Sequence, residues 1–232
     1  MNTGISYSDL LHYDLGKGVE AFSTRRDSDL PYPVVTGHQV HDTRIAVIDS
    51  RETTREDLEG YDAFVTDKAE IAIGVRTADC VPVLLYDPDK QVVAAVHAGW
   101  KGTVQRITQK TVVFMQQRFK TDPSNVRAVL GPSISPDSFQ VGEEVVRYFK
   151  EQGFPLTKIW FFNEGEGSSE MYHGHHIDLW MANAWLLESC GVSRENISIA
   201  GIDTYSDHTY FSARREGMAC GRIISAIKII SV

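Results

Sequence analysis

Two apolar runs joined by a short polar segment occupy the middle of this chain and predict a β-hairpin. The runs cover residues 81–86 and 91–96, and Asp87-Pro88-Asp89-Lys90 separates them. A four-residue loop between two such runs is typical of a hairpin. A hairpin fixes two neighbouring strands and the faces of both, so this segment constrains the fold more than any other.

The two ends of this hairpin carry a thiol and an imidazole. If Tyr86 pairs with Gln91, counting back along both strands pairs Cys80 with His97. Directly opposed residues have Cβ atoms roughly 4.5–5.5 Å apart, which suits a shared metal ion or a nucleophile–base pair. Pro82 leads us to expect an edge strand or a bulge, and a bulge would put the two groups on opposite faces. A buried, inert cysteine beside a core histidine stays open as the alternative.

Composition narrows the class of protein. The 232 residues are 42% hydrophobic and 23% charged, as in ordinary globular proteins. The formal net charge of -8 argues against binding to nucleic acid or an anionic membrane, because both need a basic surface. Residues 1–9 lack the features of a secretory signal, and no apolar run is long enough to cross a bilayer. With three cysteines, Cys80, Cys190 and Cys220, we expect reduced thiols in the cytoplasm.

The remaining pattern predicts a mixed α/β fold in one domain, residues 1–232. Segments rich in Val and Ile predict strands at 44–48, 62–66, 71–76, 81–86, 92–96, 126–130, 197–202 and 223–230. Apolar periodicity predicts helices at 103–119, 141–152 and 178–190, the last with Asp178 as N-cap. Strands come in runs with helices between the runs, so we expect mixed sheets with helices on their outer faces.

His41 joins Cys80 and His97 as a candidate metal ligand. It closes the segment Gly37-His38-Gln39-Val40-His41, just before a predicted strand. Two histidines and one cysteine, without an obvious fourth ligand, fit a catalytic zinc site and also a copper site. Four other histidines compete as ligands: His38, His173, His175 and His176. A metal-free cysteine hydrolase, with His97 as base to Cys80, and a structural metal site in a binding module stay open as other classes.

Further polar residues are candidates for handling protons and anions. Asp79 adjoins Cys80 and is a candidate general base, with a turn or capping role as the alternative. Lys101 follows Gly99-Trp100 at the start of a predicted helix, where N–H groups favour an anion. Arg214 and Arg215 suit carboxylate or phosphate, with a salt-bridged turn as the alternative.

Taken together, these motifs resemble a bacterial family variously called polyphenol oxidase (laccase-domain), purine nucleoside phosphorylase and peptidoglycan editing factor. The resemblance runs over nearly the whole chain and is most specific from Thr77 to Gly102. The matching motifs are Gln39-Val40-His41, Asp62-Ala63, Thr66-Asp67, Thr77-Ala78-Asp79-Cys80-Val81-Pro82, Val96-His97-Ala98-Gly99-Trp100, Gly131-Pro132-Ser133-Ile134, Val141-Gly142, Asp178-Leu179, Ser212, Arg214-Arg215 and Gly221-Arg222.

The resemblance implies a four-layer fold with two mixed sheets between helices, and a metal bound by His41, Cys80 and His97. For that metal we expect zinc, with copper as the alternative. It implies phosphorolysis of adenosine, inosine and methylthioadenosine, with adenosine deamination beside it. Copper-dependent oxidation of phenols and a cytoplasmic amidase that edits peptidoglycan precursors are the alternatives. The predicted catalytic residues are Cys80, Asp79 and His97, and the predicted contacts to substrate or phosphate are Lys101, Arg214, Arg215 and Gln39.

Two positions depart from the family pattern. Members usually have a cysteine before the Thr-Tyr pair, where this chain has Asp203-Thr204-Tyr205, so a mechanism that needs a second thiol there is in doubt. The arginine that usually follows Gly-Trp is Lys101, which keeps the charge but loses the bidentate fork.

Overall fold

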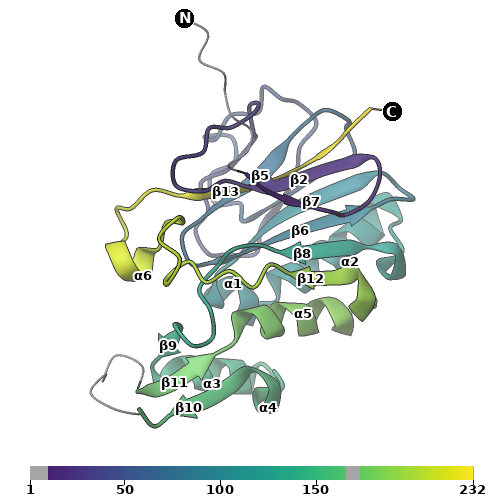
Figure 1. Ribbon diagram of the computed structural model, residues 1–232. Coiled ribbons are helices and arrows are strands. Elements are labelled where there is room, and N and C mark those ends of the chain that lie inside the picture. The colour runs from purple at the N-terminus through teal and green to yellow at the C-terminus, as the bar shows by residue number, and fades with distance from the viewer. Residues whose placement is uncertain (1–9, 166–172, 232) are drawn as a thin grey trace, which may run out of the picture.

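In a computed structural model that describes residues 10–165 and 173–231, two large sheets stack on each other and helices cover one of them (Figure 1). Residues 1–9, where we expect no secretory signal, lie outside the described residues. The strands are β1 (Leu11–Tyr13), β2 (Val19–Ser23), β3 (Ile45–Val47), β4 (Ala63–Thr66), β5 (Ile73–Thr77), β6 (Val81–Asp87), β7 (Val92–Ala98), β8 (Arg127–Leu130), β9 (Gln140–Val141), β10 (Trp160–Asn163), β11 (Gly174–Ile177), β12 (Ile197–Ile199) and β13 (Ile223–Ile229).

Six α-helices and two short 3₁₀ turns connect the described strands. The helices are α1 (Trp100–Val104), α2 (Ile107–Phe119), α3 (Glu143–Glu151), α4 (Leu156–Ile159), α5 (Leu179–Ser189) and α6 (Ala213–Glu216), and the 3₁₀ turns are η2 (Pro123–Asn125) and η4 (Arg194–Asn196). None of the helices in residues 10–165 and 173–231 has the length and apolar character needed to cross a bilayer.

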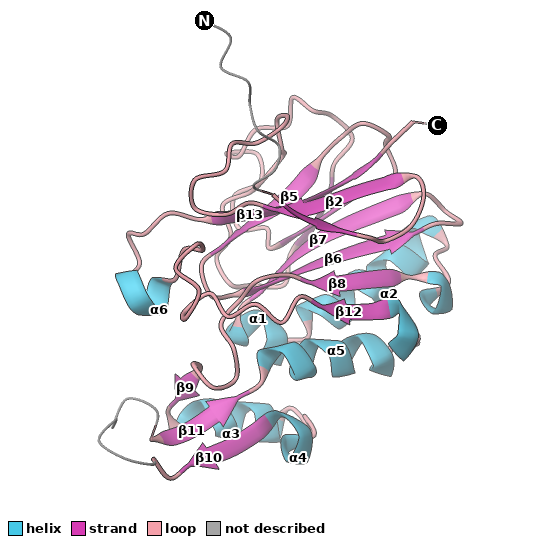
Figure 2. Cartoon of the chain, in the orientation of Figure 1, coloured by secondary structure: helices cyan, strands magenta, loops and turns pink. Residues whose placement is uncertain are grey.

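The larger sheet has six strands in the order β12-β8-β6-β7-β4-β3. Its two outer pairs, β12 with β8 and β3 with β4, are parallel, and the inner pairs are antiparallel. This mixture confirms the predicted mixed α/β class. Helices α1, α2 and α5 lie along one face of this sheet (Figure 2).

The hairpin β6–β7 is buried along its whole length because both faces of the sheet are covered. Alternate residues such as Val83 and Val96 pack toward the helices. The residues between them, such as Leu84 and Ala95, pack against β5 and β13 of the second sheet. The even positions of β6 and the odd positions of β7 therefore face the space between the two sheets.

The second sheet is antiparallel, with four strands in the order β1-β2-β13-β5. Among the described residues, loop residues such as Leu30, Tyr32 and Val34 cover its outer face, and no helix does (Figure 2). A third sheet, β10-β11-β9, lies apart from the other two together with α3 and α4 (Figure 1). The described residues thus form three sheets: the two large ones that the resemblance implies, and this smaller one.

The register of the hairpin corrects the predicted pairing. Pro82 lies opposite His97, and extension of the ladder by two residues pairs Cys80 with Gly99. The predicted loop is shifted because Asp87 continues the strand, while Gln91 takes a left-handed conformation with φ of 52° and belongs to the turn. A shift of two residues keeps Cys80 and His97 on one face, so the two side chains are diagonal neighbours instead of direct partners.

Pro82 lies neither on an edge strand nor in a bulge. Strand β6 is central in its sheet, and the ladder to β8 begins at Val83 opposite Leu130. Pro82 lies just before that ladder and its carbonyl accepts a hydrogen bond from the N–H of Gly131, 2.9 Å away. A proline near the first residue of a strand is tolerated because little of the ladder needs its missing N–H.

Candidate metal centre

Three side chains from separate segments meet where the hairpin ends. His97 is in β7, Cys80 lies in the turn before β6, and His41 lies in the loop before β3. One ligand atom from each of the three lies within 4.8 Å of the others, and no further group of this kind forms among the described residues. The Sγ atom of Cys80 is 3.7 Å from Nε2 of His41. The ring centres of His41 and His97 are 4.8 Å apart.

A buried carboxylate organises these ligands. Asp62 is fully buried directly before β4, and its Oδ1 lies 2.7 Å from Nδ1 of His97. The same carboxylate accepts hydrogen bonds from the backbone N–H groups of Val40, His41 and Asp42, at 2.9–3.0 Å. Three consecutive N–H groups around one anion form a nest, and this nest holds His41 at a left-handed φ of 65°. Asp62 thus positions two of the three ligands.

The contact with Asp62 also fixes which ring nitrogen of His97 is available. Because Nδ1 donates its proton to the carboxylate, Nε2 carries the lone pair that a metal needs. Pairing of a metal-ligating histidine with a carboxylate is the usual outer-sphere arrangement. The His97–Asp62 pair therefore fits a metal ligand better than it fits a packing residue.

Burial and charge set the protonation of the site. Burial raises the pKa of the Cys80 thiol, but the neighbouring imidazoles of His97 and His41 outweigh it and lower that pKa to about 6. Burial lowers the pKa of His97, but Cys80 and Asp62 outweigh it and raise that pKa to about 9. Both shifts favour a thiolate–imidazolium pair in the metal-free site. The thiolate is the form that binds metal, and metal binding would release the proton of His97.

The spacing suits a small tetrahedral ion after modest closure. Ligand bonds of about 2.0–2.3 Å put the ligand atoms of such an ion roughly 3.3–3.8 Å apart. The Cys80–His41 distance of 3.7 Å already lies in that range. The largest separation of 4.8 Å in the group requires about 1 Å of closure. The residues present thus fit zinc or copper.

Gly99 provides the space in which the ligands approach each other. A Cβ atom at this position would lie 2.9 Å from Cys80 Sγ and 2.9 Å from Cδ2 of His41. Gly99 has an ordinary extended backbone, with φ of -67°. The requirement for glycine is therefore a matter of space rather than of backbone conformation.

We predict that Gly99→Ala weakens metal binding by about tenfold or more, because the added methyl group pushes two ligands apart. Gly102→Ala in α1 is the matched control, since its added Cβ would meet only Ile107 at 3.3 Å and two backbone oxygens at 3.5 and 3.7 Å. Competition with a chromogenic chelator measures both variants. Equal affinities for the two variants would contradict the role given to Gly99.

A cavity of about 640 Å³ opens over the three ligands. That volume lies in the range of sites for small organic molecules. Its lining includes Gly37, His38, Gln39, Arg55, Arg76, Ala78, Asp79, Trp100, Ile134, Phe139, Ala213, Arg214, Met218, Cys220 and Arg222. The predicted residues Gln39, Asp79 and Arg214 are thus at the cavity.

Asp79 lies next to Cys80 with a left-handed φ of 85°. Its Oδ1 accepts a hydrogen bond from the Thr204 hydroxyl and its Oδ2 accepts one from the N–H of Arg214, both at 2.7 Å. Asp79 therefore links the cysteine turn to the two loops on the other side of the cavity. Its predicted catalytic role remains a prediction beside this structural one.

Gln39 pairs with the main chain of β5. Its amide nitrogen donates to the carbonyl of Arg76 and its amide oxygen accepts from the N–H of Arg76, both at 2.9 Å. Strand β5 is an edge strand, so the Gln39 side chain takes the place of a neighbouring strand there. Its polar atoms are engaged in this pairing, and Gln39 positions the cavity wall.

Two predicted anion contacts do not line the cavity. Lys101 is on the exposed side of α1, with its ammonium 5.7 Å from the Trp100 ring. The guanidinium of Arg215 donates to the carbonyls of Thr204, Tyr205 and Tyr210 and pairs with Glu216 at 2.7 Å. Arg215 thus holds a loop together, as in the salt-bridged turn that the sequence left open. Neither side chain is therefore placed to hold phosphate in the cavity.

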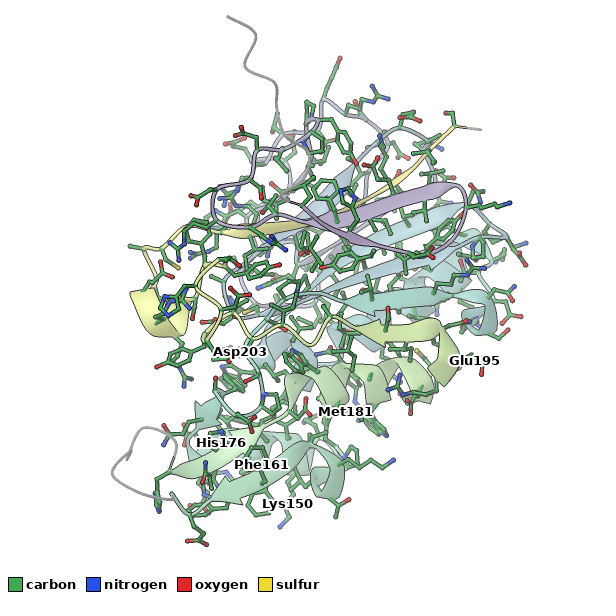
Figure 3. The ribbon with its side chains drawn as sticks, viewed as in Figure 1. Lys150, Phe161, His176, Met181, Glu195 and Asp203 are labelled. Atoms are coloured by element: carbon green, nitrogen blue, oxygen red, sulfur yellow. The ribbon has the colours of Figure 1, made fainter. Side chains whose placement is uncertain are left out.

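The competing histidines have other partners. His38 pairs with Glu59 at 2.9 Å on the surface. His175 accepts a hydrogen bond from Trp160, and His176 stacks on Phe161 with ring centres 5.0 Å apart. Figure 3 shows His176 and Phe161 together in the small sheet, apart from the two large ones.

Asp203, where the family usually has cysteine, ties two loops together. Its Oδ1 accepts from the N–H groups of Ser135 and Tyr205, both at 3.0 Å, and its Oδ2 accepts from the Ser138 hydroxyl at 2.7 Å. It lies in the loop after β12 (Figure 3). Burial raises the pKa of this carboxyl, but these hydrogen bonds outweigh it and leave the pKa below its usual value.

We predict that Asp203→Ala lowers the free energy of unfolding by about 1–2 kcal/mol at neutral pH, because three donors lose their acceptor. The folded-state pKa is depressed, so this contribution is present above the unfolded-state pKa of about 4. It is lost as the pH falls through the folded-state value. Urea denaturation at several pH values should therefore show the two proteins converging in acid, and a constant difference would contradict this role.

The chain is similar to known proteins over most of its length. Residues 16–230 match the family model described as multi-copper polyphenol oxidoreductase laccase. A protein of Bacteroides thetaiotaomicron named purine nucleoside phosphorylase is 40% identical over 227 residues, which cover 91% of this chain and 82% of the relative. A protein named adenosine deaminase RL5, from an unknown prokaryotic organism, is 41% identical over 201 residues, covering 84% of this chain and 74% of the relative.

Solved structures share the fold. The crystal structure of a Bacillus licheniformis protein titled hypothetical protein YfiH superposes with a TM-score of 0.80 at 23% identity, covering 91% of this chain and 92% of that one. The structure of YlmD from Geobacillus stearothermophilus gives a TM-score of 0.80 at 23% identity, covering 97% of this chain and 98% of the other.

Proposed function

Because the chain belongs to the multi-copper polyphenol oxidoreductase laccase family, some of whose members are named for purine nucleoside chemistry, we propose that it is a metal-dependent purine nucleoside phosphorylase. The proposed substrates are adenosine, inosine and methylthioadenosine, with phosphate as the second substrate. The observation that carries the proposal is the group of His41, Cys80 and His97 at the cavity, without a fourth side-chain ligand from the described residues. Structural zinc normally has four protein ligands.

The ligand set suits zinc, and copper is the alternative. When bound, the ion would act as a Lewis acid toward an oxygen or nitrogen of the substrate. The protein would hold the ion through Cys80, His41 and His97, and Asp62 would keep His97 in the required tautomer. In this proposal, the nucleoside is held in the cavity beside the ion that these residues bind.

The cavity wall offers groups for the remaining parts of the reaction. Trp100 and Phe139 line the cavity and provide faces on which a purine ring stacks. Phosphorolysis breaks the bond from C1′ of the ribose to the base nitrogen and forms a bond from C1′ to a phosphate oxygen, and the departing base takes up a proton. Asp79 is the candidate group for that proton transfer, because it lines the cavity beside Cys80.

Adenosine deamination is the second candidate activity. A relative named adenosine deaminase favours this activity. The three metal ligands and Asp79 line the same cavity, which also suits the reaction. In this reaction the oxygen of water bonds to C6 of the purine and ammonia leaves. Both activities use adenosine, but only phosphorolysis consumes phosphate.

The oxidase activity implied by the family description is a weaker candidate. Four-electron reduction of oxygen by laccases uses several copper ions and many paired histidines. The described part of this chain forms one group of three ligands. A single copper at this group would support slow oxidation of phenols, so we keep copper as the alternative metal without proposing laccase activity.

We also propose a cytoplasmic location. The three cysteines are free thiols in the described residues, with no disulfide among them. Free thiols suit a reducing compartment. The proposed partners are small molecules, a purine nucleoside and phosphate.

Product analysis tests the proposed function. Zinc-loaded protein is incubated with adenosine, inosine or methylthioadenosine, with and without phosphate. We expect free base and ribose 1-phosphate, or its methylthio derivative, only when phosphate is present, and inosine from adenosine in its absence. Recovery of intact nucleosides under all conditions would contradict the proposal.

A further inference from the structure

Three arginines that do not belong to the predicted contact set line the metal cavity: Arg55, Arg76 and Arg222. They come from three distant segments. Arg76 is in β5, Arg55 lies in the segment between β3 and β4, and Arg222 lies directly before β13. Convergence of three cationic side chains on one cavity is costly unless an anion binds between them.

Arg76 is the central residue of this cluster. Its backbone groups pair with Gln39, but in the described residues its guanidinium has no hydrogen-bond acceptor and no carboxylate partner. The side chain is partly buried. Burial lowers the pKa of the Arg76 guanidinium, and the charges of Arg55 and Arg222 lower it further. An arginine in this setting lacks a counter-charge.

Arg55 and Arg222 are held in place by uncharged groups. Nε of Arg55 donates to the carbonyl of Gly37 at 3.3 Å. The guanidinium of Arg222 donates to the carbonyls of Gly221 and Met218, both at 2.9 Å, and to that of Cys220. Backbone carbonyls fix the orientation of these side chains without cancelling their charge. The one acidic residue in the described lining is Asp79, whose two oxygens accept from Thr204 and Arg214.

The cluster is also tied to the metal ligands. Gln39 pairs with Arg76 and stands two residues before His41. Arg76 itself stands four residues before Cys80, across the turn that leads into β6. The pairing of Gln39 with Arg76 thus fixes the arginine relative to two of the three ligands.

We propose that Arg76, supported by Arg55 and Arg222, binds the phosphate that takes part in the reaction. This inference rests on the proposed phosphorolysis and assigns its second substrate to a place in the cavity. Guanidinium groups recognise the oxygens of phosphate in bidentate pairs, and three of them neutralise its charge. The arrangement replaces Lys101 and Arg215, which the sequence suggested for this role.

Phosphate binding to the zinc-loaded protein tests the assignment. Isothermal titration calorimetry with inorganic phosphate is compared for the wild type, Arg76→Gln and Arg76→Lys. We expect Arg76→Gln to weaken phosphate binding by about tenfold or more, which corresponds to about 1.4 kcal/mol. Arg76→Lys should recover part of this loss because it restores the charge without the fork. The KM for phosphate in the cleavage of inosine should rise in the same order.

Arg118→Gln is the matched control. Arg118 is an exposed arginine of α2 whose guanidinium lies over Phe119, outside the cavity lining. It should leave phosphate binding unchanged. If Arg76→Gln does not fold, as judged by circular dichroism, Arg222→Gln takes its place with the same expectation.

The outcomes separate this inference from the proposed function. Inosine cleavage with an unchanged KM for phosphate in Arg76→Gln would overturn the arginine site and leave phosphorolysis in place. Phosphate binding that depends on Arg76, without cleavage of any nucleoside, would support the anion site and contradict phosphorolysis. Absence of phosphate binding to the wild type would overturn both.

Discussion

Cys80→Ser should lose stoichiometric metal and nearly all turnover of nucleosides. The serine hydroxyl stays protonated where the Cys80 thiolate forms readily, since its neighbours hold the thiol pKa at about 6. Serine is therefore a poor ligand for zinc or copper at this position. We expect metal affinity to fall by at least about 100-fold. Changes to outer-sphere partners alone cost up to about 100-fold, and Cys80 is a direct ligand. Inductively coupled plasma mass spectrometry of purified protein and competition with a chelator measure the effect.

Cys220→Ser is the matched control for this variant. Cys220 also lines the cavity, but it does not belong to the group of three ligand residues. It should retain the metal, because its thiol is not one of the three ligands. If Cys80→Ser still bound one equivalent of zinc as tightly as Cys220→Ser does, Cys80 would not be a ligand. Turnover by metal-free wild-type protein would instead point to covalent catalysis by the Cys80 thiolate.

The second large effect concerns Asp62, which sequence analysis noted only as part of a family motif. Asp62→Asn should lower the free energy of unfolding of the metal-free protein by about 2–4 kcal/mol. The carboxylate accepts four hydrogen bonds, from three backbone N–H groups and from His97. In asparagine an amide NH₂ group replaces one carboxylate oxygen, so a donor faces donors where an acceptor is needed. The buried His97 also loses its counter-charge.

Urea denaturation after removal of metal measures this loss without the contribution of metal binding to stability. Asp87→Asn is the control, because Asp87 is another fully buried carboxylate, at the end of β6, with two backbone partners and one unpaired oxygen. We expect Asp87→Asn to leave metal affinity unchanged, and Asp62→Asn to weaken it about 10–100-fold. A normal metal affinity in Asp62→Asn would show that Asp62 has no part in holding His97 and His41.

Much of the fold follows from local pattern. All eight predicted strand segments contain a strand, because their Val- and Ile-rich runs supply the buried residues of the two stacked sheets. Asp178 caps α5 as predicted, with its Oδ1 accepting from the N–H of Met181 at 2.8 Å. The predicted helix at 103–119 is divided into α1 and α2 because Arg106 takes a left-handed φ of 66°.

Other elements carry little local signal. Strands β1 and β2 are short and mix apolar residues with His12 and Glu20. Strand β2 is fixed by pairing with β13, which is far away in the sequence, and β1 pairs with β2. The small sheet β10-β11-β9 presents Trp160 and Phe161 partly to solvent, so apolar pattern does not mark it as a buried strand. Pairing with other strands determines these elements, and local pattern does not contain that information.

The candidate site was predictable in its chemistry and only partly in its geometry. Cys80 directly precedes β6 and His97 lies near the end of β7, so their proximity follows from the hairpin, although the register differs from the predicted one by two residues. The place of His41 depends on the contact of residues 40–42 with Asp62, which no spacing reveals. An acidic residue directly before a buried strand was the available signal for Asp62. The cluster at Arg76 had no signal of this kind, because its three arginines are far apart in the sequence.

The central claim is that one sulfur and two imidazole nitrogens of this chain bind a single metal ion. X-ray absorption spectroscopy of the protein loaded with one equivalent of zinc tests it most directly. We expect one sulfur at about 2.3 Å and two imidazole nitrogens at about 2.0–2.1 Å, with the sulfur signal absent in Cys80→Ser. A zinc spectrum that contains no sulfur, or one that keeps its sulfur in Cys80→Ser, would contradict the account.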